Sequence, residues 1–302
     1  MASSSGLVSK RPSTHHARAC LGFERDSNAY IASAPIPAVM LQELPPFPFA
    51  NNPVFICIDL ERAACRGNCL TEIGLTVLDT RDLGPRTKPQ PIPGTPPGNR
   101  GQGWFKFLRT THIRIAEHLH EDCGRSYCKG DPRMFAFGQS VIIKLSNVKR
   151  RLEDWYKNIE LRGLAAGETK RHVIVLTFAS YLEETELRIQ DVSWFQAVDE
   201  AWDIQKMGFS TRIAASLPTP KPKPSLSDLV QHLGIVPDSD RSRLLHNAGN
   251  DSAFEIQCML SGLLLDPVEW ASLGLAPLQY LSPSWREHHI NANQLPAASL
   301  EG

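Results

Sequence analysis

The sequence predicts an α/β protein built on a mixed β-sheet. Three strand-like runs follow one another from residue 54, a helical apolar period covers residues 135–161, and a continuous apolar run spans residues 172–178. Neighbouring strands with short connections favour an antiparallel meander, whereas a continuous apolar strand suits a position covered on both faces. This order of strands and helices indicates a sheet with antiparallel and parallel parts, flanked by helices.

The N-terminal half supplies the meander. The first strand is predicted at Val54–Ile58, a β-branched and aromatic run, and the second at Leu70–Leu78. Residues 62–69 between them are polar and long enough for a hairpin loop. Residues 84–103 are rich in Pro and Gly and are expected to form a loop, after which Trp104–Ile115 is predicted as the third strand.

Apolar residues at three- and four-residue spacing predict the helix over residues 135–161. A short strand is expected at His172–Phe178, an acidic helix at Tyr181–Arg188 and a further short strand at Trp202–Met207. The exposed face of the 135–161 helix carries Lys and Arg, which form either an ordinary solvated surface or one that steers a phosphate backbone.

Two helices are predicted near the C-terminal end. Ser225 has the properties of an N-cap and Gly234 those of a C-cap, so a short helix is expected between them. Apolar spacing predicts a second helix at Asn250–Leu265.

The predicted organisation is one folded domain with two flanks. Residues 1–50 are expected to be a disordered leader, because no acidic residue precedes Glu24 and Pro becomes frequent before the first strand. Residues 51–266 are expected to form the folded domain, and residues 267–302, which lack a clear period, an irregular C-terminal tail.

Composition excludes several functional classes. A chain of 302 residues with zero formal net charge is not a general electrostatic binder of nucleic acid, although a local basic groove is compatible with it. No apolar run approaches the length of a membrane span and no secretory signal is visible, so no membrane partner is expected. Seven cysteines without a dense framework indicate reduced thiols and a cytoplasmic or nuclear location. Protein partners are not identified by the sequence.

Two acidic signals far apart in the sequence indicate the chemistry. Asp59 and Glu61 follow the first strand two residues apart, so their carboxylates project from the same face. Carboxylates at one point repel each other unless a cation lies between them, and oxygen ligands suit Mg²⁺ or Mn²⁺. His246 and Asp251, before the last predicted helix, could add a proton acceptor and a further ligand. This combination is typical of metal-dependent phosphodiester cleavage.

In these residues the chain resembles the DEDDh 3′–5′ exonucleases of the ribonuclease H-like superfamily. The resemblance rests on Asp-x-Glu at 59–61, Thr-Glu-Ile-Gly at 71–74 and His-x4-Asp at 246–251, and it covers residues 53–265. It is closest to a fungal exonuclease-like branch, through segments such as CIDLER, HIRIAEHLH and LLHNAGNDSAFEIQCML. The resemblance implies a ribonuclease H-like mixed sheet.

The resemblance also implies roles for individual residues. Asp59, Glu61 and Asp251 are expected to hold two divalent ions, Mg²⁺ or Mn²⁺, and His246 is expected to act as the general base. An imidazole can accept a proton near neutral pH without a large pKa shift.

The chain departs from the family pattern at the remaining acidic position. The strand at 172–178 ends in Thr-Phe where the family has Gly-His, and no Asp follows before Asp191. Glu183 is the best-placed substitute for the family's Asp and is expected to be the fourth metal ligand, with Glu184 next to it.

Three functions are therefore considered. The leading hypothesis is a metal-dependent 3′–5′ exonuclease that hydrolyses phosphodiester bonds at the ends of single-stranded RNA or DNA. The substitution at the fourth acidic position motivates a second, a catalytically degenerate ribonuclease H-like protein that binds nucleic acid. Zero net charge is compatible with a third, a protein-interaction scaffold.

A zinc site is a weaker alternative interpretation of part of the chain. Four cysteines and two histidines lie in separate segments with loose spacing, which favours scattered thiols over a zinc site: Cys65, Cys69, Cys123, Cys128, His118 and His120.

Overall fold

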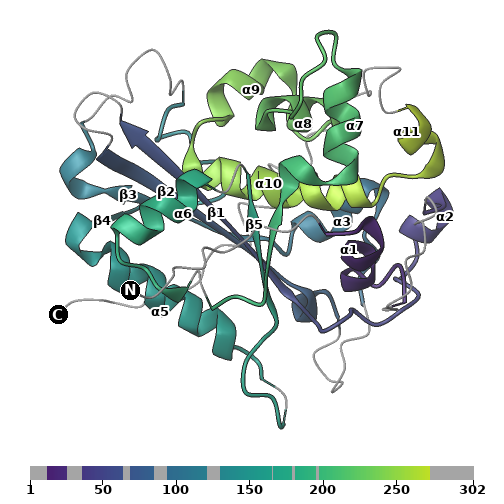
Figure 1. The fold of residues 1–302 in the computed structure, drawn as a ribbon, viewed down its shortest axis with the longest axis horizontal. Coiled ribbons are helices and arrows are strands. Elements are labelled where there is room, and N and C mark those ends of the chain that lie inside the picture. Colours follow the sequence, from purple (N-terminus) through teal and green to yellow (C-terminus); the bar gives the residue numbers. More distant parts are fainter. Residues whose placement is uncertain are drawn as a thin grey trace, which may run out of the picture.

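The centre of the molecule is a mixed sheet whose strands follow the order β4-β3-β2-β1-β5-β6 (Figure 1). The structure, a computed structural model, describes residues 12–25, 36–63, 69–84, 94–120, 130–164, 166–178, 181–194 and 197–272. The strands are β1 (Val54–Ala63), β2 (Cys69–Asp79), β3 (Arg109–Ile115), β4 (Val141–Ile143), β5 (Val173–Thr177) and β6 (Glu200–Asp203). β1, β2 and β3 pair antiparallel, whereas β5 pairs parallel with β1, β6 with β5 and β4 with β3. The predicted mixed α/β sheet is confirmed.

Helices cover both faces of this sheet. The described helices are α1 (Thr14–Cys20), α2 (Ala38–Leu41), α3 (Gln102–Phe105), α5 (Val148–Leu161), α6 (Tyr181–Ile189), α7 (Gly208–Ser216), α8 (Leu226–His232), α9 (Asp238–Leu244), α10 (Ala248–Leu263) and α11 (Pro267–Ser272). Single 3-10 turns lie at η2 (Thr80–Leu83), η3 (Asn99–Gly101), η4 (Ala116–His118), η5 (Leu145–Asn147) and η7 (Ile204–Lys206). Within the described part of the chain, no helix is long and apolar enough to cross a membrane.

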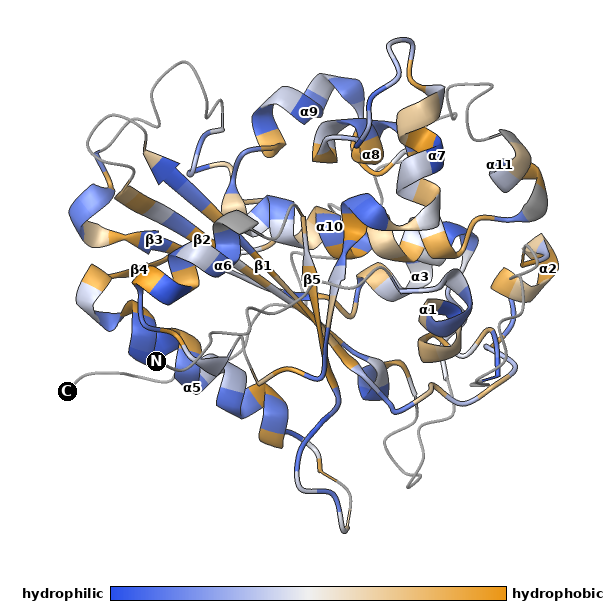
Figure 2. Cartoon of the chain, viewed as in Figure 1, coloured by the Kyte–Doolittle hydropathy of each residue, from blue (hydrophilic) through white to orange (hydrophobic). Residues whose placement is uncertain are grey.

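Alternation along β1 divides the apolar side chains between two cores. Phe55 and Cys57 belong to the core beneath α10, whereas Ile56 and Ile58 belong to the core beneath α5. Figure 2 shows the apolar residues along β1 and β5 and the hydrophilic surface of α5. Because successive strand residues point to opposite faces, the odd-numbered residues of β1 all face α10.

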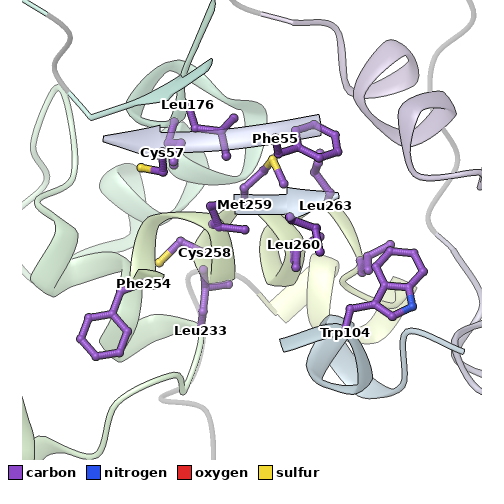
Figure 3. Close-up of a cluster of buried hydrophobic side chains, with 14 of the residues drawn as sticks. Phe55, Cys57, Trp104, Leu176, Leu233, Phe254, Cys258, Met259, Leu260 and Leu263 are labelled. Carbon is purple, nitrogen blue, oxygen red and sulfur yellow. The ribbon is translucent and has the colours of Figure 1, made fainter. Parts of the chain in front are cut away.

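Helix α10 is the central element of the larger core. All its residues are buried, and it lies across the middle of the sheet with α7 and α8 against it (Figure 1). Figure 3 shows side chains of α10 against those of β1, β5 and neighbouring segments: Phe254, Cys258, Met259, Leu260 and Leu263 with Phe55, Cys57, Trp104, Leu176 and Leu233. This packing fixes the position of α10 relative to β1 and β2.

The N-terminal region differs from its prediction. Within the predicted disordered leader of residues 1–50, residues 12–25 and 36–50 are described and contain α1 and α2, so the prediction is wrong for them. Leu21 and Leu41 are buried in the α10 core, and the buried Arg18 donates from Nε to the carbonyl oxygen of Leu263 at 2.9 Å. The leader is ordered here because its apolar side chains cover the C-terminal end of α10.

Several predicted boundaries also change. The helix predicted over residues 135–161 begins only at Val148, because the apolar residues at 141–143 form β4 on the edge of the sheet. Trp104, predicted in a strand, lies in α3, and β3 begins at Arg109. The strand predicted at Trp202–Met207 ends at Asp203 and continues as η7. Residues 267–272 of the predicted irregular tail form α11.

Other predicted elements are confirmed. β1 and β2 form the antiparallel hairpin, β5 lies parallel to β1, and α6 spans Tyr181–Ile189. α8 has a capping box. The Ser225 side chain accepts from the backbone N–H of Asp228, and the Asp228 side chain accepts from the backbone N–H of Ser225.

The contribution of the N-terminal segment to stability is testable by truncating one buried side chain. Leu21→Ala removes a fully buried side chain and should lower the free energy of unfolding by about 2–5 kcal/mol. Val39→Ala is the control, because Val39 in α2 is 64% exposed and its truncation should change stability by less than about 0.5 kcal/mol. Chemical denaturation measures both values, and equal stability of the two variants would show that α1 does not belong to the core.

Candidate metal centre

Two carboxylates of strand β1, those of Asp59 and Glu61, lie on the face of the sheet that α10 covers. Asp59 and Glu61 continue the odd-numbered series that begins with Phe55 and Cys57, and both are half-buried. Their partners in β2 are Gly74 and Glu72. The prediction that Asp59 and Glu61 share a face is confirmed.

The N-terminus of α10 supplies the other half of the cluster. The side chain of Asn247 caps the helix by accepting from the backbone N–H of Asn250 at 3.1 Å. Asn250 in turn bonds to the preceding segments, donating from Nδ2 to the carbonyl oxygens of Leu244 at 2.9 Å and Met134 at 3.0 Å. These bonds hold the start of α10 against the loop that precedes β4.

His246 and Asp251 are tied together at this helix start. His246 is exposed and has a φ of 60°, in the left-handed region that non-glycine residues rarely adopt. Its backbone N–H donates to Oδ2 of Asp251 at 2.9 Å. The left-handed residue therefore turns the chain into α10 while its N–H fixes the buried carboxylate of Asp251.

A glycine in β2 permits the close approach of α10. A Cβ atom built at Gly74 would lie 1.7 Å from the carbonyl oxygen of Ala248, the first residue of the helix. Gly249 is also confined, though less tightly, since a Cβ built there would lie 2.7 Å from the Cβ of His112. Because any larger residue at position 74 would displace the helix start, Gly74 sets the distance between the two halves of the cluster.

Three predicted residues meet closely. The ligand atoms of Glu61, His246 and Asp251 all lie within 4.8 Å of one another. Asp59 is not among these three residues, but it lies two residues before Glu61 in β1. Burial raises its pKa well above the usual range, and the charges of Glu61 and Asp251 raise it further. Burial and the charge of Glu61 likewise raise the pKa of Asp251. Asp59, Glu61, His246 and Asp251 are therefore one electrostatic cluster.

Glu183 joins the cluster from α6. It lies in the first turn of the helix, is 6% exposed, and its charge contributes to the raised pKa of Asp59. Burial raises its own pKa to about 7; Asp203 adds to this increase and Arg62 opposes it. Glu184 instead forms a surface ion pair with Arg188 at 3.1 Å. Of these two neighbouring acids, only Glu183 belongs to the cluster.

The carboxylate oxygens of the cluster fit a divalent cation. Asp59 Oδ2, Glu183 Oε2 and Asp251 Oδ1 are buried and have no hydrogen-bond partner among the described residues. Buried carboxylate oxygens require a proton, a donor or a cation. Four carboxylates beside one imidazole are a hard, oxygen-rich donor set of the kind that Mg²⁺ and Mn²⁺ prefer. Asp59, Glu61, Glu183 and Asp251 are thus able to hold such ions.

Two buried acids beneath the cluster were not predicted from the sequence. Glu255 follows Asp251 by one helical turn, is 1% exposed and accepts a hydrogen bond from the Cys57 thiol at 2.8 Å. Burial raises its pKa well above the usual range. Asp203 at the end of β6 is 1% exposed and pairs with Lys206 at 3.1 Å. An acidic residue four positions after Asp251 in an apolar helix was the available signal for Glu255.

Glu72 has a structural role at the helix start. Its Oε2 lies 2.8 Å from Nε2 of the buried His112, and the backbone N–H of Ala248 donates to the same oxygen at 3.4 Å. Ser140 Oγ lies 2.8 Å from the other ring nitrogen of His112. Glu72 therefore connects β2 to β3 through His112 and to α10 through Ala248.

Half of the candidate zinc ligands, which the sequence favoured as scattered thiols, lie outside the described residues. Cys65, Cys123 and Cys128 lie outside them, so this alternative is not addressed by the structure. Nδ1 of His118 lies 2.6 Å from the carbonyl oxygen of Leu70, which gives that ring nitrogen a structural partner.

A mixed sheet with an acidic cluster at the end of its central strand is the arrangement of a ribonuclease H-like α/β fold. Residues 54–262 match the family described as DEDDh_C, DNA polymerase III subunit epsilon-like, C-terminal domain. The protein belongs to this DEDDh exonuclease family, whose members generally use divalent metals. No curated protein matches the chain.

The close approach at Gly74 is testable with an added methyl group. Gly74→Ala should destabilise the protein by about 1–3 kcal/mol, because the new Cβ overlaps the Ala248 carbonyl and displaces the helix start. Gly208→Ala is the control, since its Cβ would meet only Thr14 Oγ1 at an ordinary 3.5 Å. Thermal and chemical unfolding measure both, and a Gly74→Ala variant as stable as Gly208→Ala would contradict the packing described for α10.

The need for a cation is testable without measuring activity. Asp59→Asn removes one of the mutually repelling charges, so without divalent ions the variant should melt a few degrees above the unmodified protein. Millimolar Mn²⁺ or Mg²⁺ should raise the melting temperature of the unmodified protein but have much less effect on Asp59→Asn. Asp154→Asn, which alters an exposed acid on α5, should respond to the metal like the unmodified protein. Equal responses of all three proteins would exclude a metal centre at Asp59.

Proposed function

We propose that the protein is a metal-dependent 3′–5′ exonuclease that hydrolyses the terminal phosphodiester bonds of single-stranded RNA or DNA. The observation that carries this proposal is the group of Glu61, His246 and Asp251, whose ligand atoms lie within 4.8 Å of one another. Buried carboxylate oxygens of Asp59, Glu183 and Asp251 that have no hydrogen-bond partner among the described residues support it. Family membership supports a nucleic-acid substrate. The polarity of cleavage and the choice between RNA and DNA belong to the proposal.

The carboxylates have the role of holding two divalent ions, Mg²⁺ or Mn²⁺. Asp59 and Glu61 come from β1, Glu183 from α6 and Asp251 from α10. When bound, such ions lower the pKa of the attacking water and offset the charge that grows on the phosphate. The three secondary-structure elements that supply these ligands are held together by the cores on either side of the sheet.

His246 has the role of general base. Its side chain is exposed at the start of α10, where water and a substrate end have access, and it lies within the same group as Glu61 and Asp251. The bond from its backbone N–H to Asp251 couples the position of the base to that of a ligand. In the proposed reaction the imidazole accepts a proton from the attacking water.

Glu183 replaces the Asp that the family has at the fourth acidic position. Its side chain is one methylene longer, but it starts from the first turn of α6 and its carboxylate is buried close enough to Asp59 to raise the pKa of that residue. These observations favour a ligand role and support activity over a degenerate site.

A catalytically degenerate nucleic-acid-binding protein is the second candidate. The observation in its favour is the replaced fourth acid itself, because catalysis is sensitive to misplacement of a reacting group by about 1 Å. We further propose a cytoplasmic or nuclear location, and the relation to a fungal branch of the family stays a prediction.

Cleavage of end-labelled strands tests the proposal. The unmodified protein, given 5′-labelled single-stranded RNA and DNA with Mg²⁺ or Mn²⁺, should produce a ladder that shortens from the 3′ end. The ladder should vanish with EDTA and in Asp59→Ala. Binding of the strands without any ladder would leave the degenerate protein as the explanation, and neither binding nor cleavage would favour the scaffold.

The role of Glu183 is separately testable against its neighbour. Glu183→Gln should lower kcat by about 10²-fold or more, because the amide is a poor ligand at a position that requires a charged oxygen. Glu184→Gln alters the surface acid paired with Arg188 and should leave kcat within about twofold. Equal kcat values for the two variants would remove Glu183 from the metal centre.

A further inference from the structure

A pocket of about 370 Å³ adjoins the metal centre, and none of the steps proposed above uses it. Its lining comes from the start of β2, the end of β3 and the segment that precedes β4: chiefly Thr71, Glu72, Arg114, His118, Asp131 and Arg133. Its volume is comparable to the smaller ligand pockets of proteins.

The pairing of the strands relates this pocket to the metal centre. Glu61 of β1 is opposite Glu72 of β2, and Glu72 is opposite Arg114 of β3. Residues directly opposite in antiparallel strands project from the same face, so all three project from the face that α10 covers. Two strand spacings separate the backbones of Glu61 and Arg114, a distance of about 10 Å.

The pocket and the metal centre also share walls. Thr71 Oγ1 donates to the carbonyl oxygen of Glu61 at 3.0 Å. A Cβ built at Gly130 would lie 1.7 Å from the carbonyl oxygen of His246, and Asn247 Nδ2 donates to the carbonyl oxygen of Asp131 at 3.3 Å. A ligand bound at one site therefore lies directly beside the other.

The lining of the pocket carries two acids and two arginines, and both acids are bonded to other side chains. Asp131 is neutralised by a bidentate pair with Arg133, with two distances of 2.9 Å, and Glu72 is bonded to His112. The hydrogen bonds of Arg133 lower the pKa of Asp131, and the charge of the half-buried Arg114 lowers it further. The carboxylate of Asp131 is bonded to Arg133, so it leaves the Arg114 guanidinium available to a ligand, and the planar fork of that guanidinium matches the oxygens of a phosphate.

We propose that this pocket binds a phosphodiester group of the nucleic-acid strand other than the one being cut, and that Arg114 is the residue that contacts it. This inference rests on the proposed function. The acidic metal centre is suited to the phosphate at the cleavage point, whereas Arg114, whose backbone is about 10 Å from that of Glu61 on the same face, binds the backbone of the same strand. Contacts of this kind fix the register of a strand without reading its sequence.

The test is the salt dependence of strand binding by the full chain in the presence of Mg²⁺. The probe is a fluorescent single strand with a 3′-terminal phosphorothioate linkage, which slows cleavage during the measurement. Arg114→Gln should raise Kd by about 10-fold and reduce the slope of log K against log [salt] by about 0.7, the value for one phosphate contact with a single strand.

Two further variants make the comparison specific. Arg114→Lys should keep the slope of the unmodified protein, because the charge remains, while its Kd rises less than that of Arg114→Gln. Arg150→Gln removes an exposed arginine from α5, on the other face of the sheet, and should leave Kd and slope unchanged. Melting temperatures show whether each variant is folded. If Arg114→Gln does not fold, the rise in Kd of Arg114→Lys is the result that tests the inference.

The outcomes separate this inference from the proposed function. Unchanged Kd and slope for Arg114→Gln would overturn the inference, and a cleavage ladder from the unmodified protein would still stand. An Arg114-dependent slope without any ladder would support the pocket and defeat the exonuclease. Inorganic phosphate that binds only when Arg114 is present, with no change in strand binding, would assign the pocket to a free anion and overturn the inference. Failure of the unmodified protein to bind the strand would overturn both.

Discussion

The contact between the start of helix α10 and strand β2 determines where the functional side chains lie. Gly74 has no side chain, so the Ala248 carbonyl rests directly on the strand. This contact brings Asp251 and His246, at the N-terminal end of the helix, against Asp59 and Glu61 at the end of β1. The rest of the helix is buried among apolar side chains, and this core holds the contact closed.

The same packing creates an electrostatic cost that the apolar core cannot relieve. Removing carboxylates from water beside one another raises their pKa values. It also leaves oxygens of Asp59, Glu183 and Asp251 without donors among the residues that the structure describes. A stable cluster of this kind needs protons or a cation, and a divalent cation converts the repulsion into attraction. Fold stability and metal binding are therefore coupled through these side chains, whereas the neighbouring Arg114 offers the positive charge that a phosphate backbone requires.

The sequence was sufficient where a pattern is local. Alternation after the first strand predicted the shared face of Asp59 and Glu61, and apolar spacing predicted α10 to within two residues at each end. The sequence was insufficient where tertiary contacts decide whether a segment is ordered and where an element begins. The apolar side chains within residues 12–25 show no helical or strand period, yet contact with α10 orders them. The three residues of β4 have the same apolar spacing as α5, so the sequence pattern does not separate the strand from the helix. The burial of Glu255 depends on its neighbours, and an isolated acid in a helix normally faces solvent.

The central claim is that the carboxylates of β1, α6 and α10 share bound divalent ions. Crystals grown with Mn²⁺ and measured at a wavelength where manganese scatters anomalously test it most directly. The claim predicts anomalous peaks bounded by Asp59, Glu61, Glu183 and Asp251, with the carboxylate oxygens at about 2.0–2.2 Å from the ions. Anomalous peaks for Mn²⁺ at other places in the crystal, with no peak between these four carboxylates, would contradict the claim.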